Sequence, residues 1–294
     1  MDRRTFSIRA ATGLLAATLG NWRAPAQAAT RLRVPRHELR RVEKESGGRL
    51  GVAAIDTGSG AALGYRASER FPLCSTFKLL AVGALLGQID HGAPPLETRV
   101  QYTEKDLVAN SPVTSMHVNE GMSLAGLCEA AMTRSDNTAG NLILKQIGGL
   151  PQFNAFARSL GDSVTRLDRY ETELNTAIPG DPRDTTTPAA MAQNLRKLVL
   201  TGVLSEKARQ SLTQWLLDCK TGDARMRAGF PAHWRIGDKT GTGDYCTAND
   251  LGIIWPPQRA PLLLAVYLTN SKATPERRNA AIAEVARLVA GSVG

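Results

Sequence analysis

The chain has 294 residues, enough for one large domain or two closely packed ones with a sizeable core. Its formal net charge is +9, but the basic residues are scattered among acidic ones rather than gathered with aromatics, which argues against a nucleic-acid groove. The four cysteines form no C-x-x-C pair and the four histidines are far apart in the sequence, so no zinc-site spacing exists and we expect neither metal nor cofactor.

Residues 1–28 are predicted to be an export signal. Arg3-Arg4-Thr5-Phe6 resembles a twin-arginine tag, and the apolar stretch from Ala10 to Gly20 is too short to span a bilayer. Ala26-Gln27-Ala28 fits a small-residue cleavage site. The alternative is a basic N-terminal tail. We expect export to a bacterial periplasm by the twin-arginine route and a mature monomer, without a membrane anchor, that begins near Ala29.

The remaining chain predicts an α+β fold. A helix is expected over residues 35–46, followed by a hairpin of strands at 50–56 and 61–65. Strand patterns return at three places near the end, and a last helix follows Thr274-Pro275. The three late strands are expected at 234–240, 247–255 and 261–268. Both chain ends then build one antiparallel sheet with flanking helices, an α/β lobe made of residues 29–68 and 221–294.

The middle of the chain, residues 69–220, is predicted to form an all-helical lobe. Helix starts are indicated at Ser123, Thr187-Pro188 and Ser205, and Gly148-Gly149 indicates a helix end.

Three short motifs carry candidate chemistry. They are Ser75-Thr76-Phe77-Lys78, Ser135-Asp136-Asn137 and Lys239-Thr240-Gly241-Thr242. Each is weak alone, since a solvated helix face, a helix cap or a strand end explains it equally well. Together they suit attack on an acyl group by serine, because a serine hydroxyl must lose its proton to a neighbouring base and Lys78 shares a helix face with Ser75. The motifs fall in both lobes, so we expect the site between them.

The three motifs, in this order, resemble those of class A serine β-lactamases. The segment from Leu167 to Asn175 resembles the carboxylate-bearing loop of that family, and Asp184 to Pro188 continues the pattern. The resemblance covers nearly all of the chain from about Arg49. It implies the β-lactamase/DD-peptidase-like fold, and hydrolysis of the β-lactam amide of penicillins and cephalosporins through a serine acyl-enzyme, which confers antibiotic resistance.

The resemblance also implies a role for each catalytic residue. Ser75 is the expected nucleophile, and Ser135 is expected to pass a proton to the leaving nitrogen. The base for acylation stays open between Lys78 and Glu171. Glu171 is the expected base for deacylation, because an acyl-serine ester is stable unless water is oriented and deprotonated.

Substrate-binding roles follow from the same resemblance. Asn175 is expected to hold the hydrolytic water with Glu171, and Asn137 to hold the amide of the substrate side chain. A second group is expected to bind the substrate carboxylate or to leave it room, namely Lys239, Thr240, Gly241 and Thr242. Arg225 is either a second cation at this place or a surface salt-bridge arginine.

Two further expectations concern local structure. The loop from Arg169 to Asp184 has the length of an Ω-loop, which those two residues could close with an ion pair. The resemblance also implies which positions would form disulfides with Cys128 and Cys74. These positions hold Val82 and Gly243, so neither disulfide is expected.

Three other functions share parts of this pattern. A penicillin-binding D-alanyl-D-alanine peptidase would share the nucleophile and lysines but lack the loop from Glu171 to Asn175, and would form a long-lived adduct. A β-lactam receptor domain would need a membrane anchor and a partner domain. A glutaminase on the same scaffold is disfavoured by the carboxylate loop. The sequence leaves the spectrum of substrates open.

Overall fold

The computed structural model describes residues 32–293, so the predicted export signal at 1–28 lies outside the described residues. Its framework is a five-stranded antiparallel sheet in the order β2-β1-β9-β8-β7. The strands are β1 (Arg49–Asp56), β2 (Ala62–Tyr65), β7 (Arg235–Gly243), β8 (Thr247–Trp255) and β9 (Leu262–Thr269). Strand β1 pairs with β9, from Arg49 opposite Thr269 to Asp56 opposite Leu262. The predicted sheet built from both parts of the chain is therefore confirmed.

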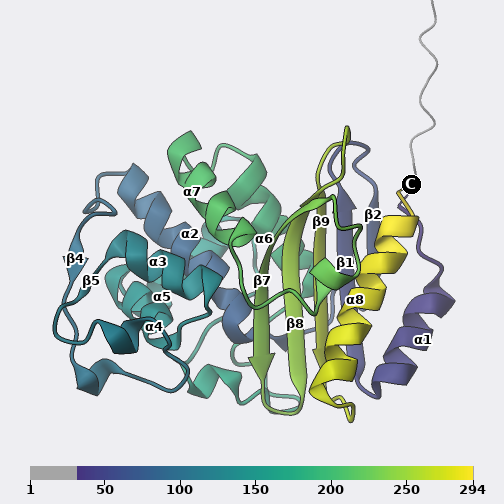
Figure 1. Cartoon of the computed structure of the whole chain (residues 1–294), viewed down its shortest axis with the longest axis horizontal. Helices are drawn as coiled ribbons and strands as arrows, with labels where there is room; N and C mark the ends of the chain where they lie inside the picture. The colour runs from purple at the N-terminus through teal and green to yellow at the C-terminus, as the bar shows by residue number, and fades with distance from the viewer. Residues whose placement is uncertain (1–31, 294) are drawn as a thin grey trace, which may run out of the picture. The chain divides into compact units, whose positions relative to one another are not determined.

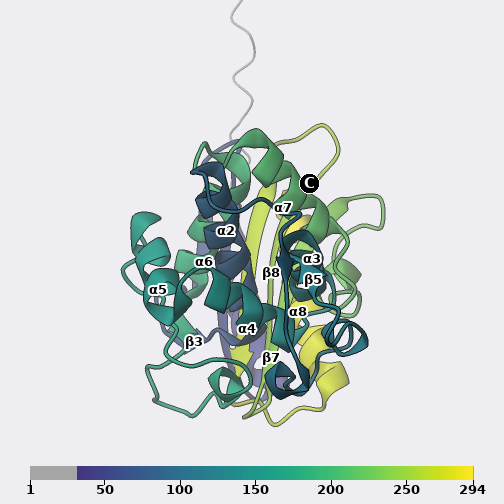
Figure 2. The same ribbon diagram turned by 90° about the vertical axis from the view of Figure 1, so that its left-hand side faces the viewer.

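Helices cover both faces of this sheet. The helices within residues 77–159, called the helical half below, lie in front of the strands in Figure 2. The α-helices are α1 (Arg36–Ser46), α2 (Phe77–Asp90), α3 (Leu124–Thr133), α4 (Asn137–Gln146), α5 (Gly149–Ser159), α6 (Pro188–Leu200), α7 (Glu206–Leu217) and α8 (Pro275–Gly291). The 3-10 helices are η1 (Cys74–Thr76), η2 (Glu104–Asp106), η3 (Thr114–Met116), η4 (Glu173–Asn175) and η5 (Met226–Ala228). Within residues 32–293, no helix has the length and apolar character needed to cross a membrane.

Two apolar cores lie on opposite faces of the sheet. Helices α1 and α8 pack against each other and cover one face (Figure 1), where Val52, Leu264 and Val285 are buried together. Helices α6 and α7 cover the other face and connect it to the helical half. Because both faces are covered, every residue of β9 is buried, which explains why its sequence reads as a continuous apolar run.

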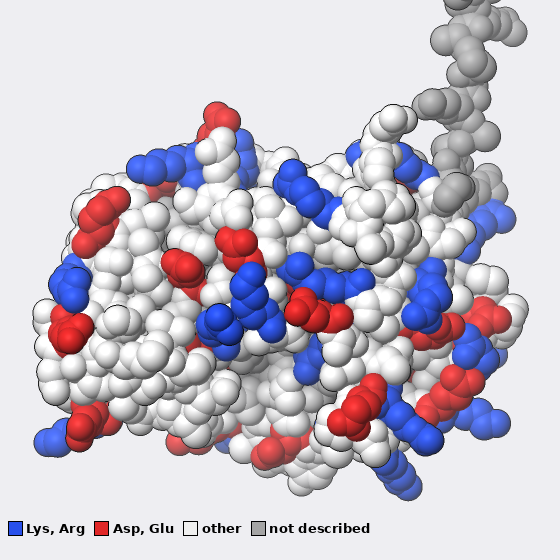
Figure 3. Space-filling model, in the orientation of Figure 1, with Lys and Arg blue, Asp and Glu red and all other residues white. Residues whose placement is uncertain are grey.

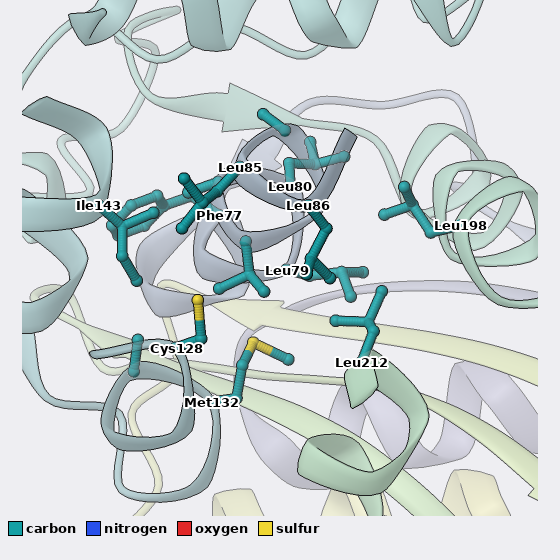
Figure 4. Close-up of a cluster of buried hydrophobic side chains, with 14 of the residues drawn as sticks. Phe77, Leu79, Leu80, Leu85, Leu86, Cys128, Met132, Ile143, Leu198 and Leu212 are labelled. Atoms are coloured by element: carbon teal, nitrogen blue, oxygen red, sulfur yellow. The ribbon is translucent and has the colours of Figure 1, made fainter. Parts of the chain in front are cut away.

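Helix α2 is the centre of the helical half. All ten of its residues from Phe77 to Leu86 are buried, and the helix contacts α3, α4, α5 and α7. Figure 4 shows Phe77 of α2 beside Ile143 of α4, and Leu79 of α2 beside Met132 of α3. A helix that is apolar on all sides is stable only when it is surrounded by protein. The buried packing of α2 therefore fixes the position of η1, which directly precedes its N-terminus.

Side-chain caps fix most helix starts that the sequence indicated. Ser123, Thr187 and Ser205 each accept a hydrogen bond from the backbone N–H three residues on. The pair Gly148-Gly149 ends α4 but also begins α5. Residues 69–220 also contain four strands of two residues, which are too short for any sequence pattern to reveal. They are β3 (Phe71–Pro72), β4 (Arg99–Val100), β5 (Met122–Ser123) and β6 (Thr185–Thr186).

Basic and acidic side chains are interspersed on the face shown in Figure 3. This distribution agrees with the solvated surface expected from the sequence.

Candidate active site

Ser75 lies in η1, directly before the buried helix α2. The turn that carries it is held from two sides. Thr76 Oγ1 donates to the carbonyl oxygen of Leu73 at 2.6 Å, and Asn249 Nδ2 of β8 donates to Pro72 O at 2.8 Å. Sequence reasoning missed Asn249, because a single asparagine in a strand has no pattern that reveals its partner nearly two hundred residues away.

Lys78 lies one helical turn beyond Ser75, on the same face of the chain. Its Nζ donates to Ser75 Oγ at 2.9 Å, to Ser135 O at 2.9 Å and to Asn137 Oδ1 at 2.7 Å, and it lies 3.0 Å from Glu171 Oε1. Burial lowers the pKa of Lys78, while the negative charge of Glu171 opposes that effect. Four acceptor atoms around one nitrogen fit the ammonium form of Lys78.

Glu171 lies in the long loop between α5 and α6, and its carboxylate contacts both Ser75 and Lys78. Ser75 Oγ donates to its Oε1 at 3.3 Å, and Asn175 Nδ2 donates to its Oε2 at 2.5 Å. Asn141 of α4 holds the backbone of Glu171 by two 2.9 Å hydrogen bonds, one to its carbonyl and one from its N–H. The peptide bond between Glu171 and Thr172 is cis. Asn141 was not identified from the sequence.

The predicted ion pair across the base of this loop is confirmed. Arg169 Nε lies 2.6 Å from Asp184 Oδ2. The backbone N–H groups of Asp168 and Arg169 both donate to Asp184 Oδ1, at 2.7 and 2.9 Å. One buried carboxylate therefore closes the loop through three hydrogen bonds.

The motif Ser135-Asp136-Asn137 connects the helical half to β7. Ser135 Oγ accepts a 3.0 Å hydrogen bond from Lys239 Nζ. Asp136 is fully buried, and it accepts hydrogen bonds from the N–H groups of Val113, Thr114 and Ala139. Asp136 therefore caps α4, as the helix-cap interpretation of this motif predicts. Its carboxylate also holds the loop that contains Val113 and Thr114.

Strand β7 carries the third motif close to the nucleophile turn. A Cβ atom at Gly241 would lie 3.1 Å from Leu73 O, so only a residue without a side chain allows this approach freely. Lys239 Nζ also donates to Thr240 O at 2.8 Å. Burial, and next the positive charge of Lys78, lower the pKa of Lys239 to about 7.

Arg225 is not a surface salt-bridge arginine, so that alternative is wrong. The residue is buried behind β7, and its guanidinium donates to Gly241 O at 2.8 Å, to Asn249 O at 2.7 Å and to Thr242 Oγ1 at 2.7 Å. Among residues 32–293 it has no carboxylate partner within ion-pair distance.

The structure thus brings the sequence-predicted residues into one hydrogen-bonded set. Lys78 connects Ser75, Ser135, Asn137 and Glu171, and Lys239 joins the set through Ser135. Arg225 joins Thr242 from behind the strand. All four cysteines are free thiols. In the part of the chain that the structure describes, no group of three His, Cys, Asp or Glu residues could hold a metal ion.

Comparisons with known proteins agree with this set. Residues 35–293 match the model of the β-lactamase enzyme family. The chain is 51% identical to β-lactamase AST-1 of Nocardia asteroides over 253 aligned residues. These residues make up 86% of this chain and 82% of AST-1. This chain is 50% identical over 252 residues to β-lactamase Toho-1 of Escherichia coli, which covers 86% and 87%.

A solved structure gives the same result. The class A β-lactamase of the last common ancestor of Gram-negative bacteria superimposes with a TM-score of 0.87 at 59% identity, over 88% of this chain and 98% of that one. By sequence and by fold, the chain therefore belongs to the β-lactamase enzyme family, in its class A branch.

Proposed function

We propose that this enzyme hydrolyses the β-lactam amide of penicillins and cephalosporins through an acyl-enzyme on Ser75, and so confers resistance to these drugs. One observation carries the proposal: Ser75 Oγ is in hydrogen-bond contact with both Lys78 and Glu171, and Glu171 is held in turn by Asn175. A nucleophile beside a base that a third group orients is the general arrangement for covalent catalysis by serine.

In acylation, Ser75 Oγ attacks the carbonyl carbon of the lactam and gives up its proton. Lys78 has the surroundings of an ammonium, so we assign the proton to Glu171, whose Oε1 lies 3.3 Å from the hydroxyl. Lys78 then stabilises the developing negative charge and holds Ser75 in place. The C–N bond breaks as Ser135 donates its proton to the lactam nitrogen. Lys239, whose Nζ donates to Ser135 Oγ at 3.0 Å, replaces the proton that Ser135 has given up.

The backbone N–H groups of Ser75 and Thr242 are the proposed oxyanion hole. The close approach of β7 to the nucleophile turn at Gly241 supports it, because the two donors must converge on one oxygen. Each such donor contributes on the order of 3 kcal/mol to transition-state stabilisation in comparable hydrolases.

Deacylation requires a water that is both oriented and deprotonated. Before this step Glu171 passes the proton it took from Ser75 on to Lys239, which gave one to Ser135, so that Glu171 is a carboxylate again. Glu171 would then take a proton from the water as the water attacks the ester carbonyl. The ester C–O bond breaks, Glu171 returns the proton to Ser75 Oγ, and the ring-opened acid is released. Asn175 supports this role, since its Oδ1 is buried and has no hydrogen-bond partner among the described residues while its Nδ2 holds Glu171. Together the two side chains offer the water acceptors on both sides.

Substrate binding is proposed to involve three groups. Asn137 would hold the side-chain amide of the drug. Lys239, Thr240 and Thr242 would bind the carboxylate found on penicillins and cephalosporins, with Arg225 acting through Thr242 Oγ1. Gly241 leaves space for the drug along β7.

The experiment that separates this function from a D-alanyl-D-alanine peptidase is a count of turnovers. The purified enzyme should hydrolyse many equivalents of penicillin, whereas a peptidase would consume about one and stall. Ser75→Ala should abolish both turnover and covalent labelling by penicillin, measured by intact mass. A protein that stalls after one equivalent, or a Ser75→Ala variant that is still labelled, would overturn the proposal.

We also propose that the protein is exported to the periplasm by the twin-arginine route and acts there as a monomer of two lobes, residues 29–68 with 221–294 and residues 69–220. The double substitution Arg3→Lys with Arg4→Lys should leave activity in the cytoplasm, measured by cell fractionation. A conservative Arg9→Lys control should still be exported.

A further inference from the structure

Two buried carboxyl groups lie behind the carboxylate-binding strand and take no part in the proposed chemistry. Asp238 of β7 and Asp250 of β8 are both fully buried. The two strands are paired with Asp238 opposite Gly252 and Thr240 opposite Asp250, so the two aspartates are diagonal neighbours on the same face of the sheet. One oxygen of each group has a donor: Arg227 Nε at 2.5 Å from Asp238 Oδ1, and Met226 N at 3.0 Å from Asp250 Oδ2. The other oxygens, Asp238 Oδ2 and Asp250 Oδ1, have no donor among the described residues.

Two facing acceptors without a donor are costly in a buried place, and one proton between them removes the cost for both. Within residues 32–293 no side-chain hydrogen bond reaches either of these two oxygens. The thiol of Cys219, the other donor near Asp238, contacts Thr221 Oγ1 at 3.3 Å. The backbone of Gly222 covers Asp238 Oδ2 so closely that a Cβ atom there would lie 1.9 Å from this oxygen. Two carboxylates in contact also cannot both ionise cheaply.

The surrounding charges decide which acid keeps the proton. Burial raises the pKa of Asp238 as well, but the ion pair with Arg227 of η5 opposes this effect and favours the ionised form of Asp238. Burial and the charge of Asp238 raise the pKa of Asp250 well above its usual range, although Arg225 opposes them. Three more titratable groups act nearby: Lys239 of β7 and Cys219 after α7 act on Asp238, and Arg278 of α8 acts on Arg225.

We propose that Asp250 is a neutral acid that donates its proton to Asp238, so that the pair carries one negative charge, which Arg227 neutralises. Arg225, and Lys239 below about pH 7, then remain as positive charges without an ion-pair partner in the described structure. The shared proton thereby keeps the field behind β7 positive. Asp250 is a positioning residue: it touches no substrate, and acts through Arg225 and Asp238.

The positive field behind β7 would favour binding of a substrate that carries a carboxylate, and this consequence rests on the proposed function. The shared proton itself does not rest on it. It is therefore tested by measurements that need no catalysis.

The central variant is Asp250→Asn, because an amide keeps an acceptor for Met226 N and a donor for Asp238 Oδ2. The matched control is Asp162→Asn. Asp162 is also a buried aspartate, but its carboxylate accepts from the N–H groups of Val164 and Thr165 and from Asn194, and these hydrogen bonds lower its pKa against the opposing effect of burial.

Infrared difference spectroscopy provides the first measurement. Near pH 7 the parent minus Asp250→Asn spectrum should contain the carbonyl stretch of a protonated carboxylic acid, and the Asp162→Asn difference should contain only carboxylate bands. If the acid band is missing from the Asp250→Asn difference, the shared proton does not exist.

The pH dependence of unfolding is the second measurement. A group whose pKa is higher in the folded state holds its proton there after the unfolded chain has released it. The parent should therefore lose stability relative to Asp250→Asn as pH rises above about 4, by up to tenfold in the folding constant per pH unit until Asp250 itself ionises. Asp162→Asn should run parallel to the parent above about pH 5. Parallel curves for the parent and Asp250→Asn would overturn the proposal.

Kinetics supply the third measurement. Because the amide replaces a neutral acid, Asp250→Asn should keep the KM for penicillin within about twofold near pH 7. A several-fold fall in KM would mean that a negative charge had been removed beside Arg225, and so that Asp250 is ionised in the parent. An enzyme that hydrolyses penicillin but shows no acid band would sink this inference alone, and an acid band in a protein without turnover would sink only the proposed function.

Discussion

Lys78 Nζ lies 3.0 Å from Glu171 Oε1, and neither side chain is exposed to solvent. An isolated ion in such a place costs several kcal/mol, so each group can stay charged only because the other is present. The two residues therefore have to be treated as one unit. Removing either of them leaves an unpaired charge directly beside the Ser75 hydroxyl.

The first prediction concerns Glu171. Glu171→Gln keeps the shape of the side chain but cannot accept a proton, so deacylation should slow by at least about 10²-fold. Acylation should also slow, but less, because Lys78 Nζ remains 2.9 Å from Ser75 Oγ and can accept the proton in place of Glu171, so penicillin still labels Ser75. Intact mass spectrometry should then show a stable adduct that the parent does not accumulate. If the variant turns over penicillin at the parental rate, Glu171 is not the deacylation base.

The second prediction concerns Gly140 of α4. A Cβ atom there would lie 2.8 Å from Lys78 Cε and 3.2 Å from Phe77 Cζ. Gly140→Ala should therefore displace Lys78 and lower kcat more than tenfold. The gain in helix propensity, about 0.5–1 kcal/mol, should offset part of the packing strain, so Tm should change little.

The control for Gly140 is Gly87→Ala in α2, where the added methyl group meets only ordinary contacts at 3.7 Å. It should keep full activity and raise Tm slightly. Equal activity in the two variants would show that Lys78 tolerates displacement.

The third prediction concerns the closure of the long loop. Asp184→Ala leaves Arg169 and two backbone N–H groups without their partner, so the free energy of unfolding should fall by on the order of 3 kcal/mol. The loop carries Glu171, so kcat should fall as well. Denaturant unfolding and kinetics measure both effects. Arg183→Ala, which breaks an exposed ion pair with Asp181 in the same loop, should do neither.

The fourth prediction is a pH dependence of substrate binding. Burial beside Lys78 lowers the pKa of Lys239 to about 7, so its positive charge is present below that pH and is lost above it. The KM for a carboxylate-bearing penicillin should therefore rise as pH increases beyond about 7. Lys239→Arg should flatten this rise, because guanidinium stays protonated. An unchanged pH profile in Lys239→Arg would mean that another group controls binding.

The same shift has the opposite sign for stability. Between about pH 7 and the unfolded value near 10.4, the unfolded chain holds the proton that folded Lys239 has lost. This group alone therefore makes the folded state more stable as pH rises through that range.

Much of the fold could be predicted because its signals are local. Caps at Ser123 and Thr187, the apolar run of β9 and the ion pair that closes the Arg169–Asp184 loop all depend on residues close in sequence or on a recurring motif. The motif residues around Ser75 were found for the same reason.

The supporting residues could not be predicted, since their partners come from distant segments. Asn141 holds Glu171 across thirty positions and Asn249 holds Pro72 across 177. Neither has a local pattern that distinguishes it from a surface asparagine. Arg225 stayed ambiguous because its burial depends on how the segment around η5 packs behind β7 and β8.

The pairing of β1 with β9 joins residues 49–56 to residues 262–269. During synthesis, β1 can pair with β2 at once, but it leaves the ribosome long before β9 exists. The edge of β1 that faces β9, a strand with seven buried residues, therefore stays unpaired until late. The sheet closes only once the chain is nearly complete. A nascent or truncated form therefore presents an apolar strand with an open edge, and needs a chaperone or rapid degradation to stay out of aggregates.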